Sequence, residues 1–423
     1  MEAATPSLQH HVDELCERAR PAGRAVAALS DQQRRDALEA AAEALEHDLA
    51  AILEANATDL VAADANGLSK AMIDRLALDA GRLEGVIADL RNVKDQPDPV
   101  GRVLEERTVA QGLRLQKVSV PIGVICIIFE SRPNVTVDTA ALCLRSGNAC
   151  ILRGGKEALH TNRALAAAFR RGLEAAGVPV DAVQLVMEQD RALLPLLLAR
   201  DEAIDLVVPR GGEGLIRAVV EMSRIPVVKH DKGVCSLYVH ADADFDMALE
   251  LAVNAKCQRP GVCNAIENLL VDRAIAASFL PRLAAVMGEQ GVELRADHAA
   301  REHIPEAVSA TDADWDTEYL DLILAVAVVD DLEAAIAFTN THSSGHSDAI
   351  VTANTVAAQT YLQQVDASSV YHNASTRFTD GAQFGLGAEV GISTNRLHAR
   401  GPMGAENLCT YKFIVYGEGQ ARS

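Results

Sequence analysis

The sequence predicts an α/β fold with two domains built on parallel sheets and a β-hairpin arm, and three observations indicate it. The chain has 423 residues, more than one ordinary hydrophobic core organises. Its N-terminal part carries apolar residues at three- and four-residue spacing, which is typical of helices. Further along, apolar strand-like segments alternate with helical ones, which favours right-handed βαβ units with parallel strands.

The N-terminal part, from Leu8 to about Asn92, is predicted to be a layer of helices. Ser30 and Gln33 form a capping box before an alanine- and leucine-rich run, and Asn66-Gly67 supplies a stop signal. We expect these helices to cover one face of a sheet.

A hairpin is predicted next, and it interrupts the first domain. Val103 to Val109 and Leu113 to Val120 are rich in β-formers and flank a turn at Gln111-Gly112. The tail, Leu408 to Tyr416, is also strand-like and is able to pair with this hairpin. The hairpin and the tail are therefore expected to form an arm that extends from the main body and exchanges strands with another subunit.

The alternation that follows sets the predicted domain boundaries. The first domain comprises residues 1–102 and 121–232, the second 233–400, and the arm 103–120 and 401–423. The strands expected on this basis are Gly123 to Phe129, Ala149 to Leu152, Ala182 to Met187, Ile204 to Val208, Cys235 to Val239, Ile266 to Val271 and Leu322 to Val329. The helices expected between them are Val135 to Arg145, Glu157 to Ala176, Arg191 to Ala199, Leu215 to Met222, Ala274 to Met287 and Leu332 to Thr339.

Composition and charge narrow the functional classes. The chain is 49% hydrophobic and its formal net charge is −20, which argues against a nucleic-acid surface, because such a surface needs a basic face. No apolar run is long enough to span a bilayer, and the N-terminus lacks the features of a secretory signal. We expect a cytoplasmic protein whose partners are small molecules or copies of itself.

Eight scattered cysteines contain no CxxC pair, so neither a metal site nor a disulfide framework is indicated. Cys263 differs from the others because it follows a Pro-Gly turn and precedes a short polar run that leads into a strand. Lys256 and Arg259 lie just upstream, and nearby cations favour the reactive thiolate. On these local features alone, a packed structural cysteine is the alternative interpretation.

Motifs spread over most of the chain resemble the aldehyde dehydrogenase superfamily, and within it the branch that reduces acyl phosphates. In chain order they are Val120-Pro-Ile-Gly-Val-Ile, Phe129-Glu-Ser-Arg-Pro-Asn-Val, Leu152-Arg-Gly-Gly-Lys-Glu-Ala, Ile204-Asp-Leu-Val-Val-Pro-Arg-Gly-Gly, Gln258-Arg-Pro-Gly-Val-Cys-Asn-Ala and Thr341-His-Ser-Ser-Gly-His-Ser-Asp. The resemblance implies two Rossmann-like, aldehyde dehydrogenase-like domains with a catalytic cleft between them. It also implies that Cys263 is the nucleophile.

The resemblance implies further catalytic parts. Asn134 takes the place of the asparagine that stabilises the oxyanion in the superfamily, although a helix cap before Val135 is the other interpretation. The glutamate base of the aldehyde-oxidising members is replaced by His230, or His230 is only a polar loop residue. Because that base promotes hydrolysis of the thioester, its loss suits an enzyme that works in the reductive direction.

The first domain is expected to bind the cofactor. Arg153 and Lys156 follow a strand and suit a ribose 2′-phosphate, which favours NADPH over NADH. Gly211-Gly212 opens a helix whose N-terminus can face phosphates, although no GxGxxG occurs. Glu318 matches the superfamily glutamate that contacts the nicotinamide ribose.

The substrate implied by the resemblance is L-glutamyl 5-phosphate, an anion that an acidic protein must hold with locally concentrated basic groups. Four loop arginines are candidates, and Arg132 and Arg259 are preferred over Arg377 and Arg396 because they flank the predicted oxyanion donor and the nucleophile. His346 is a further candidate for contact with the substrate or its phosphate.

The function implied is NADPH-dependent reduction of L-glutamyl 5-phosphate to L-glutamate 5-semialdehyde, a step toward proline that proceeds through a cysteine thioester. One alternative is a CoA-acylating or other aldehyde dehydrogenase. A catalytically inactive nucleotide-binding or assembly protein is an alternative from another class. No metal is expected, a homo-oligomer is expected, and a separate glutamate kinase would supply the substrate by transient contact.

Overall fold

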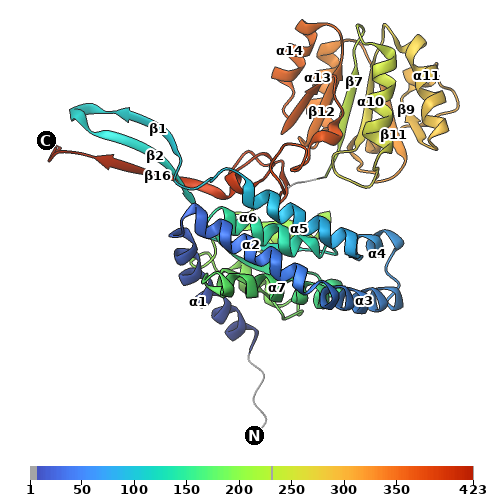
Figure 1. The fold of residues 1–423 in the computed structure, drawn as a ribbon. Coiled ribbons are helices and arrows are strands. Elements are labelled where there is room, and N and C mark those ends of the chain that lie inside the picture. The colour runs from blue at the N-terminus through green and yellow to red at the C-terminus, as the bar shows by residue number, and fades with distance from the viewer. Residues whose placement is uncertain (1–6, 230–231, 423) are drawn as a thin grey trace. The chain divides into compact units, whose positions relative to one another are not determined.

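The computed structural model describes residues 7–229 and 232–422, without the side chain of residue 71. The chain divides into two compact units. The first comprises Met1–Lys229, Gly385–Gly391 and Met403–Ser423, and the second His230–Phe384 and Ile392–Pro402 (Figure 1). His230, whose role the sequence left open, lies outside the described residues.

The first unit begins with the predicted helical layer. Its helices are α1 (Leu8–Ala27), α2 (Asp31–His47), α3 (Leu49–Ala65), α4 (Lys70–Leu76) and α5 (Ala80–Asp95). Ser30 accepts from the backbone N–H of Gln33, whose side chain accepts from the N–H of Ser30, so the predicted capping box is confirmed. The stop is also confirmed, because α3 ends at Ala65 with Asn66 as its C-cap, and Gly67 has a positive φ of 70°.

A four-stranded parallel sheet forms the core of the first unit. Its strand order is β5 (Val183–Leu185), β4 (Ala149–Arg153), β3 (Val124–Phe129) and β6 (Leu206–Arg210). The helices between them are α6 (Asn134–Arg145), α7 (Leu159–Ala175), α8 (Leu193–Leu198) and α9 (Glu213–Met222). Buried residues of α1, α8 and α9 pack on one face of this sheet in a single core cluster.

The chain order of these strands creates a switch point. From β3 the chain moves outward to β4 and β5, then returns to the other side of β3 to form β6. The connections after β3 and β6 therefore leave in opposite directions. In open α/β sheets, ligands bind outside the carboxyl ends of the strands at such a point.

The second unit contains a seven-stranded, entirely parallel sheet. Its order is β10 (Val308–Ser309), β9 (Glu293–Ala296), β11 (Ile323–Val329), β8 (Ile266–Asp272), β7 (Cys235–Val239), β12 (Ser347–Val351) and β13 (Ser369–His372). The helices are α10 (Phe245–Cys257), α11 (Ala276–Glu289), α12 (His298–Arg301), α13 (Leu332–His342) and α14 (Thr355–Gln364). Two short strands, β14 (Ile392–Ser393) and β15 (Gly401–Pro402), pair separately.

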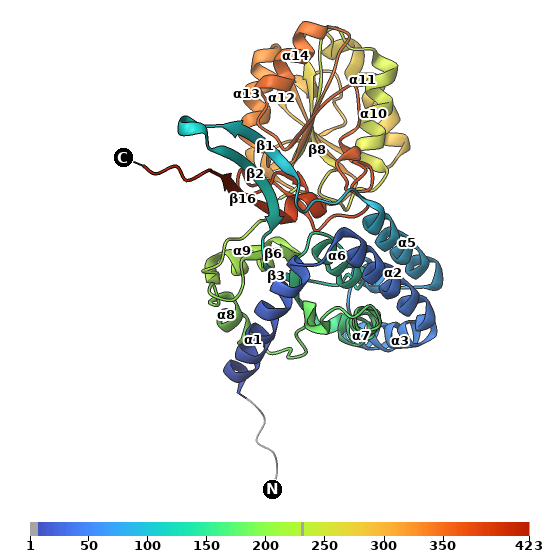
Figure 2. The same ribbon diagram turned by 60° about the vertical axis from the view of Figure 1, so that its left-hand side comes forward.

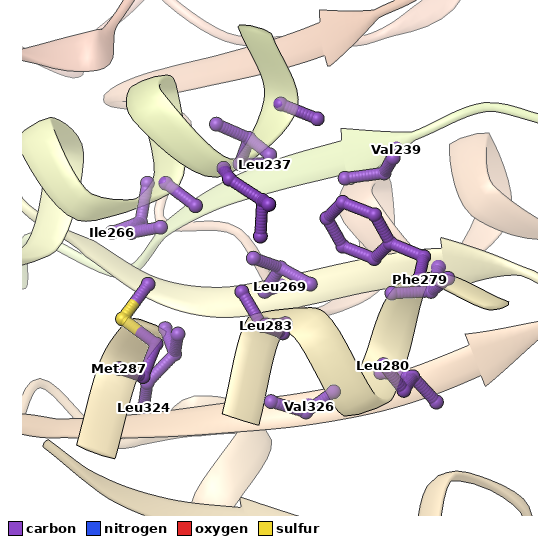
Figure 3. Close-up of a cluster of buried hydrophobic side chains, with 14 of the residues drawn as sticks. Leu237, Val239, Ile266, Leu269, Phe279, Leu280, Leu283, Met287, Leu324 and Val326 are labelled. Atoms are coloured by element: carbon purple, nitrogen blue, oxygen red, sulfur yellow. The ribbon is translucent and has the colours of Figure 1, made fainter. Parts of the chain in front are cut away.

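Both faces of this sheet are covered, which explains why its central strands are buried and mostly apolar. One core cluster joins the sheet to α10, α11 and α12, and the other joins it to α13 and α14 (Figure 1). Figure 3 shows the first cluster, where Phe279 and Leu283 of α11 lie against Leu269 of β8. These side chains are fully buried, so truncating one to alanine would cost roughly 2–5 kcal/mol.

The predicted arm is a three-stranded antiparallel sheet in which β2 (Arg114–Pro121) lies between β1 (Val103–Thr108) and β16 (Cys409–Tyr416) (Figure 2). The turn is confirmed at Gln111 and Gly112, which both have positive φ. Pairing of the tail with the hairpin is confirmed over the whole length of β16. Large apolar side chains are exposed on the arm, namely Val103, Leu104, Tyr411, Phe413 and Val415.

The predicted fold class, two parallel-sheet α/β parts with a hairpin arm, is confirmed. Some bounds differ: the strand expected from Ala182 to Met187 is only β5, because Val180–Ala182 forms a short 3₁₀ turn. Within the described ranges, no helix is both long and apolar enough to cross a membrane.

Candidate active site

Three predicted site residues and one glycine lie in loops at one edge of the sheet in the second unit. Glu318 lies shortly before β11, Cys263 before β8, Gly233 before β7, and His346 directly before β12. These strands are neighbours in the order β11-β8-β7-β12, and all pairs are parallel. Since parallel strands begin at the same edge, the four loops lie together at the amino ends of the strands.

The closest approach in this group is between Gly233 and Cys263. A Cβ atom at position 233 would lie within 3.0 Å of both the carbonyl oxygen and the Cα of Cys263, and 2.6 Å from Oε1 of Glu318. Only glycine leaves this space open. The structure therefore brings the predicted nucleophile and the predicted ribose-binding glutamate together.

Cys263 is one of the few accessible thiols of the chain. Six of the eight cysteines are buried, whereas Cys257 and Cys263 are partly exposed. Buried Cys235 donates from its thiol to the carbonyl oxygen of Cys263 at 3.3 Å. Burial raises the pKa of Cys235 well above its usual value, so this second sulfur stays protonated and anchors the backbone of the first.

Arg377 supplies positive charge near Cys263. Burial lowers the pKa of Arg377, the Cys263 thiolate raises it, and the charge of Arg259 lowers it. Because charge interactions weaken with distance, Arg377 lies near Cys263, and Arg259 lies near Arg377. Arg377 belongs to a loop far along the chain from Cys263 and was the less favoured candidate from sequence.

Lys256, the other cation predicted near the thiol, has a different role. Its ammonium group lies 2.5 Å from Oε2 of Glu267, and both side chains are completely buried. Burial raises the pKa of Glu267 to about 7, although Lys256 opposes the shift. Oε1 of Glu267 accepts from the N–H of Leu320 at 3.4 Å, so the ion pair holds the loop that carries Glu318.

Buried hydrogen bonds hold the loop that contains Cys263. The side-chain amide of Asn264 donates to the carbonyl oxygen of Thr379 at 2.9 Å and to that of Arg377 at 3.4 Å. The carbonyl oxygen of Asn264 accepts from the hydroxyl of Thr376 at 2.7 Å. These contacts tie the residue after the nucleophile to the loop that carries Arg377, and nothing in the sequence indicated them.

His346 is connected to these hydrogen bonds through Ser347 and is completely buried. Its Nδ1 is 2.8 Å from Oγ of Ser347, which donates to the hydroxyl oxygen of Thr379 at 2.6 Å. Nδ1 of His346 also lies 3.9 Å from the sulfur of Cys235. The structure thus places His346 among side chains that support Cys263. Arg396, by contrast, is highly exposed and pairs with Asp366.

Apart from Glu318, the predicted cofactor residues lie at the carboxyl ends of strands in the first unit. Gly211-Gly212 follows β6 at the switch point, but its Gly212 N–H donates to the carboxylate of Glu130 at 3.0 Å. Glu130 directly follows β3, so this hydrogen bond joins the loops after β3 and β6 at the switch point. A phosphate bound at the N-terminus of α9 would compete with this carboxylate.

The loop after β4 fits an anionic group better. Arg153 is 8% exposed, and its guanidinium donates to the carbonyl oxygens of Gly154 and Gln189, both at 3.3 Å. Its Nε is buried and has no hydrogen-bond partner within the described part of the chain. Lys156 is exposed on the same loop, so its ammonium group is available to a phosphate.

The remaining predicted residues, Arg132 and Asn134, also belong to the first unit. Asn134 is the first residue of α6, and its amide donates to Oδ2 of Asp138 at 2.8 Å. Burial raises the pKa of Asp138 to about 7. The side chain of Asn134 is therefore held in place by a buried carboxyl rather than by capping the helix. Arg132 is exposed.

Comparison with known proteins agrees with this arrangement. The model of the aldehyde dehydrogenase family matches residues 3–302 and 288–412. The chain belongs to the aldehyde dehydrogenase family.

The names of its most similar relatives are narrower than that of the family. It is 54% identical over 415 residues to gamma-glutamyl phosphate reductase of Opitutus terrae, covering 97% of each chain. It is 52% identical over 406 residues to the protein of that name from Moorella thermoacetica, covering 96% of this chain and 97% of the relative. The crystal structure of gamma-glutamyl phosphate reductase from Thermotoga maritima matches with a TM-score of 0.95 and 43% identity, over 98% of this chain and all of that one.

The contact between Gly233 and Cys263 gives the first prediction. In Gly233→Ala the added methyl group overlaps backbone atoms of Cys263, which cannot move as a flexible side chain does. We expect the free energy of unfolding to fall by about 1–3 kcal/mol, and alkylation of Cys263 by iodoacetamide, followed by peptide mass spectrometry, to slow.

Gly288→Ala in α11 is the matched control, because nothing lies within 4 Å of the added methyl group. Equal stability and equal alkylation rates in the two variants would show that the close approach is not a constraint.

Proposed function

We propose that the chain reduces L-glutamyl 5-phosphate to L-glutamate 5-semialdehyde, with NADPH and with release of phosphate, as a step in proline synthesis. The observation that carries the proposal is the position of Cys263. This residue is partly exposed at an edge where four loops meet, close to Arg377, which has Arg259 near it. The name shared by relatives more than 50% identical supplies the substrate.

The chemistry begins at the sulfur atom. The Cys263 thiolate attacks the acyl carbon of the substrate, and the bond to the phosphate oxygen breaks with its electron pair, so inorganic phosphate leaves and a thioester remains. Attack places negative charge on the carbonyl oxygen, which fixed N–H donors must stabilise. We assign this role to the Cys263 backbone N–H and the side-chain amide of Asn134. The bond from Asn134 to Asp138 keeps that amide oriented.

NADPH, when bound, supplies the hydride that converts the thioester into a thiohemiacetal. The protein then releases the product, because collapse of the thiohemiacetal breaks its C–S bond and returns the thiolate. We assign Arg153 and Lys156 to the 2′-phosphate of the cofactor, and Glu318 to the nicotinamide ribose. We assign Gly211 and Gly212 to the cofactor diphosphate, which would displace the carboxylate of Glu130 from the Gly212 N–H. The buried Nε of Arg153 and the exposed ammonium group of Lys156 support the first assignment.

The substrate is an anion and the chain carries a net charge of −20, so local cations must attract it. Arg259, Arg377 and Arg132 are the groups to which we assign this task. Arg377 has the strongest support, because its charge interacts with Cys263, and the charge of Arg259 acts on Arg377. We assign His346 an indirect part through Ser347 and Cys235.

We propose that the arm joins two or more copies of the chain. Phe413 and Val415 of β16 are each 52% exposed, and β1 and β16 are both edge strands of the arm. Exposed apolar side chains beside unpaired strand edges favour association with another chain. A separate glutamate kinase would deliver the acyl phosphate, and the eight free thiols suit the reducing cytoplasm.

The test of the nucleophile uses the reverse reaction, in which L-glutamate 5-semialdehyde and phosphate reduce NADP⁺. Cys263→Ala should lower turnover by at least about 1,000-fold while nucleotide binding, measured by calorimetry, is retained. Cys257→Ala, which removes the other partly exposed thiol, should remain active.

Full turnover by Cys263→Ala would eliminate the thioester route. Replacing phosphate by CoA in the same assay separates the proposal from a CoA-acylating dehydrogenase, since only the latter would turn over faster with CoA.

The cofactor assignment gives a third prediction. Lys156→Ala should weaken NADP⁺ binding roughly tenfold or more, because a hydrogen bond to a charged group is worth about 1.5–3 kcal/mol, and should leave NAD⁺ binding unchanged. Lys412→Ala on the exposed strand β16 is the control. An equal loss for both nucleotides in Lys156→Ala would contradict an ammonium group at the 2′-phosphate.

A further inference from the structure

The second unit contains a hollow of about 310 Å³, and Arg377 is the one lining residue to which a role has been assigned. It is lined by two charged side chains of opposite sign, three neutral amides and one aromatic ring, which are Arg377, Asp380, Asn254, Gln258, Gln383 and Phe378. We propose that this hollow binds the α-amino-acid end of the substrate, with Arg377 on the α-carboxylate and Asp380 on the α-ammonium group. The proposal rests on the proposed function and specifies how its substrate is selected.

The hollow lies next to the nucleophile. Asn264, the residue after Cys263, donates to the carbonyl oxygens of Arg377 and Thr379, which are on either side of Phe378. The charge of Arg377 also interacts with the thiolate of Cys263. A substrate whose acyl carbon lies at the sulfur would have its other end, a short methylene chain away, near this hollow.

Arg377 has the properties of a cation that awaits an anion. Its Nε donates to Oε1 of Gln258 at 2.8 Å, so the plane of the guanidinium is fixed by a neutral amide. Within the described residues, no carboxylate lies within 4.0 Å of its nitrogen atoms. The charge of Asp380 opposes the lowering of the Arg377 pKa by burial, but Asp380 forms no ion pair with it. The partly buried guanidinium therefore lacks an anion in contact until a ligand binds. Its two terminal nitrogens are suited to a bidentate carboxylate.

Asp380 is the complementary charge. Its Oδ1 accepts from the backbone N–H groups of Ala382 at 2.9 Å and Gln383 at 3.3 Å, so the turn that follows fixes the carboxylate. No cationic side chain of the described ranges forms an ion pair with it. A substrate ammonium group would supply the missing partner.

The charges of Arg377 and Asp380 cancel, and the other polar lining groups are neutral amides. Such a hollow favours a zwitterion over a plain dicarboxylate, because a ligand without the ammonium group leaves Asp380 unpaired beside a second anion. A ligand without the α-carboxylate leaves Arg377 unpaired in the same way. The half-exposed ring of Phe378 is able to cover the methylene chain.

The test measures binding without turnover. Ligands of the site should protect Cys263 from alkylation by iodoacetamide, which is quantified on the Cys263 peptide by mass spectrometry. L-Glutamate carries all the recognised groups, glutarate lacks the ammonium group, and 4-aminobutyrate lacks the α-carboxylate. We expect L-glutamate to protect at concentrations roughly tenfold or more below the other two, the ratio that corresponds to one unpaired polar group of about 1–3 kcal/mol.

The variants should remove one preference each. In Asp380→Asn, L-glutamate and glutarate should protect Cys263 equally well. In Arg377→Gln, L-glutamate and 4-aminobutyrate should protect it equally well. Arg273→Gln and Asp330→Asn are matched controls, because these residues form an exposed ion pair at the far end of β8 and β11. Both controls should keep the full preference for L-glutamate. Thermal unfolding of all four variants shows whether the fold is retained.

Equal protection by L-glutamate and glutarate in the wild type would overturn the subsite, as would a preference that survives in Asp380→Asn. The proposed function fails separately: an enzyme that does not oxidise L-glutamate 5-semialdehyde but whose Cys263 is protected by L-glutamate would retain the subsite and lose the reaction. Conversely, normal turnover of L-glutamate 5-semialdehyde with equal protection by all three ligands would retain the proposed reaction and overturn the subsite.

Discussion

The parallel pairing of β11, β8, β7 and β12 is the constraint on which the catalytic edge depends. Because the strands run in the same direction, the loops that precede them are forced to one edge of the sheet, whatever their own sequences. Gly233 then passes so close to Cys263 that no side chain fits between them. The position of the predicted nucleophile is thus set by the core of the second unit, and loop contacts only refine it.

Buried polar groups adjust that position. The Lys256–Glu267 pair is costly to bury, and replacing such pairs by apolar residues is often neutral for stability. Its location suggests why it is present: Glu267 is the extra residue where the pairing of β8 with β7 shifts register, and it also accepts from Leu320. Leu320 has a φ of 55°, a conformation that a non-glycine residue adopts only where its surroundings hold it. The pair therefore fixes a strained turn beside Glu318.

Much of the fold was predictable because local signals and tertiary packing agree. Ser30 and Gln33 cap α2 as their spacing predicts, and the turn at Gln111-Gly112 is where the hairpin reverses. The same holds for Cys263, since a Pro-Gly turn before an apolar strand indicates the start of that strand. Periodicity and turn chemistry act over a few residues, and these elements are decided at that range.

What the sequence could not give are contacts between segments far apart in the chain. The loop after β13 brings Arg377 and Thr379 to Asn264, so Arg377 lies near Cys263 although no local signal distinguishes it from Arg396. Lys256 was expected to act on the thiol because of its place in the sequence, yet the helical path of α10 turns it into the core. The carboxylate of Glu130 at the N-terminus of α9 was not predicted either, because it depends on which strands are neighbours.

The most direct measurement is to trap the acyl group on the protein. The chain would be mixed with L-glutamyl 5-phosphate, generated in place by a glutamate kinase with ATP, in the absence of NADPH, and then digested and analysed by mass spectrometry. We predict a glutamyl adduct on the Cys263 peptide that hydroxylamine removes and that NADPH, added before quenching, discharges. Efficient turnover with no adduct on Cys263, or an adduct only on another cysteine, would contradict covalent capture at this sulfur.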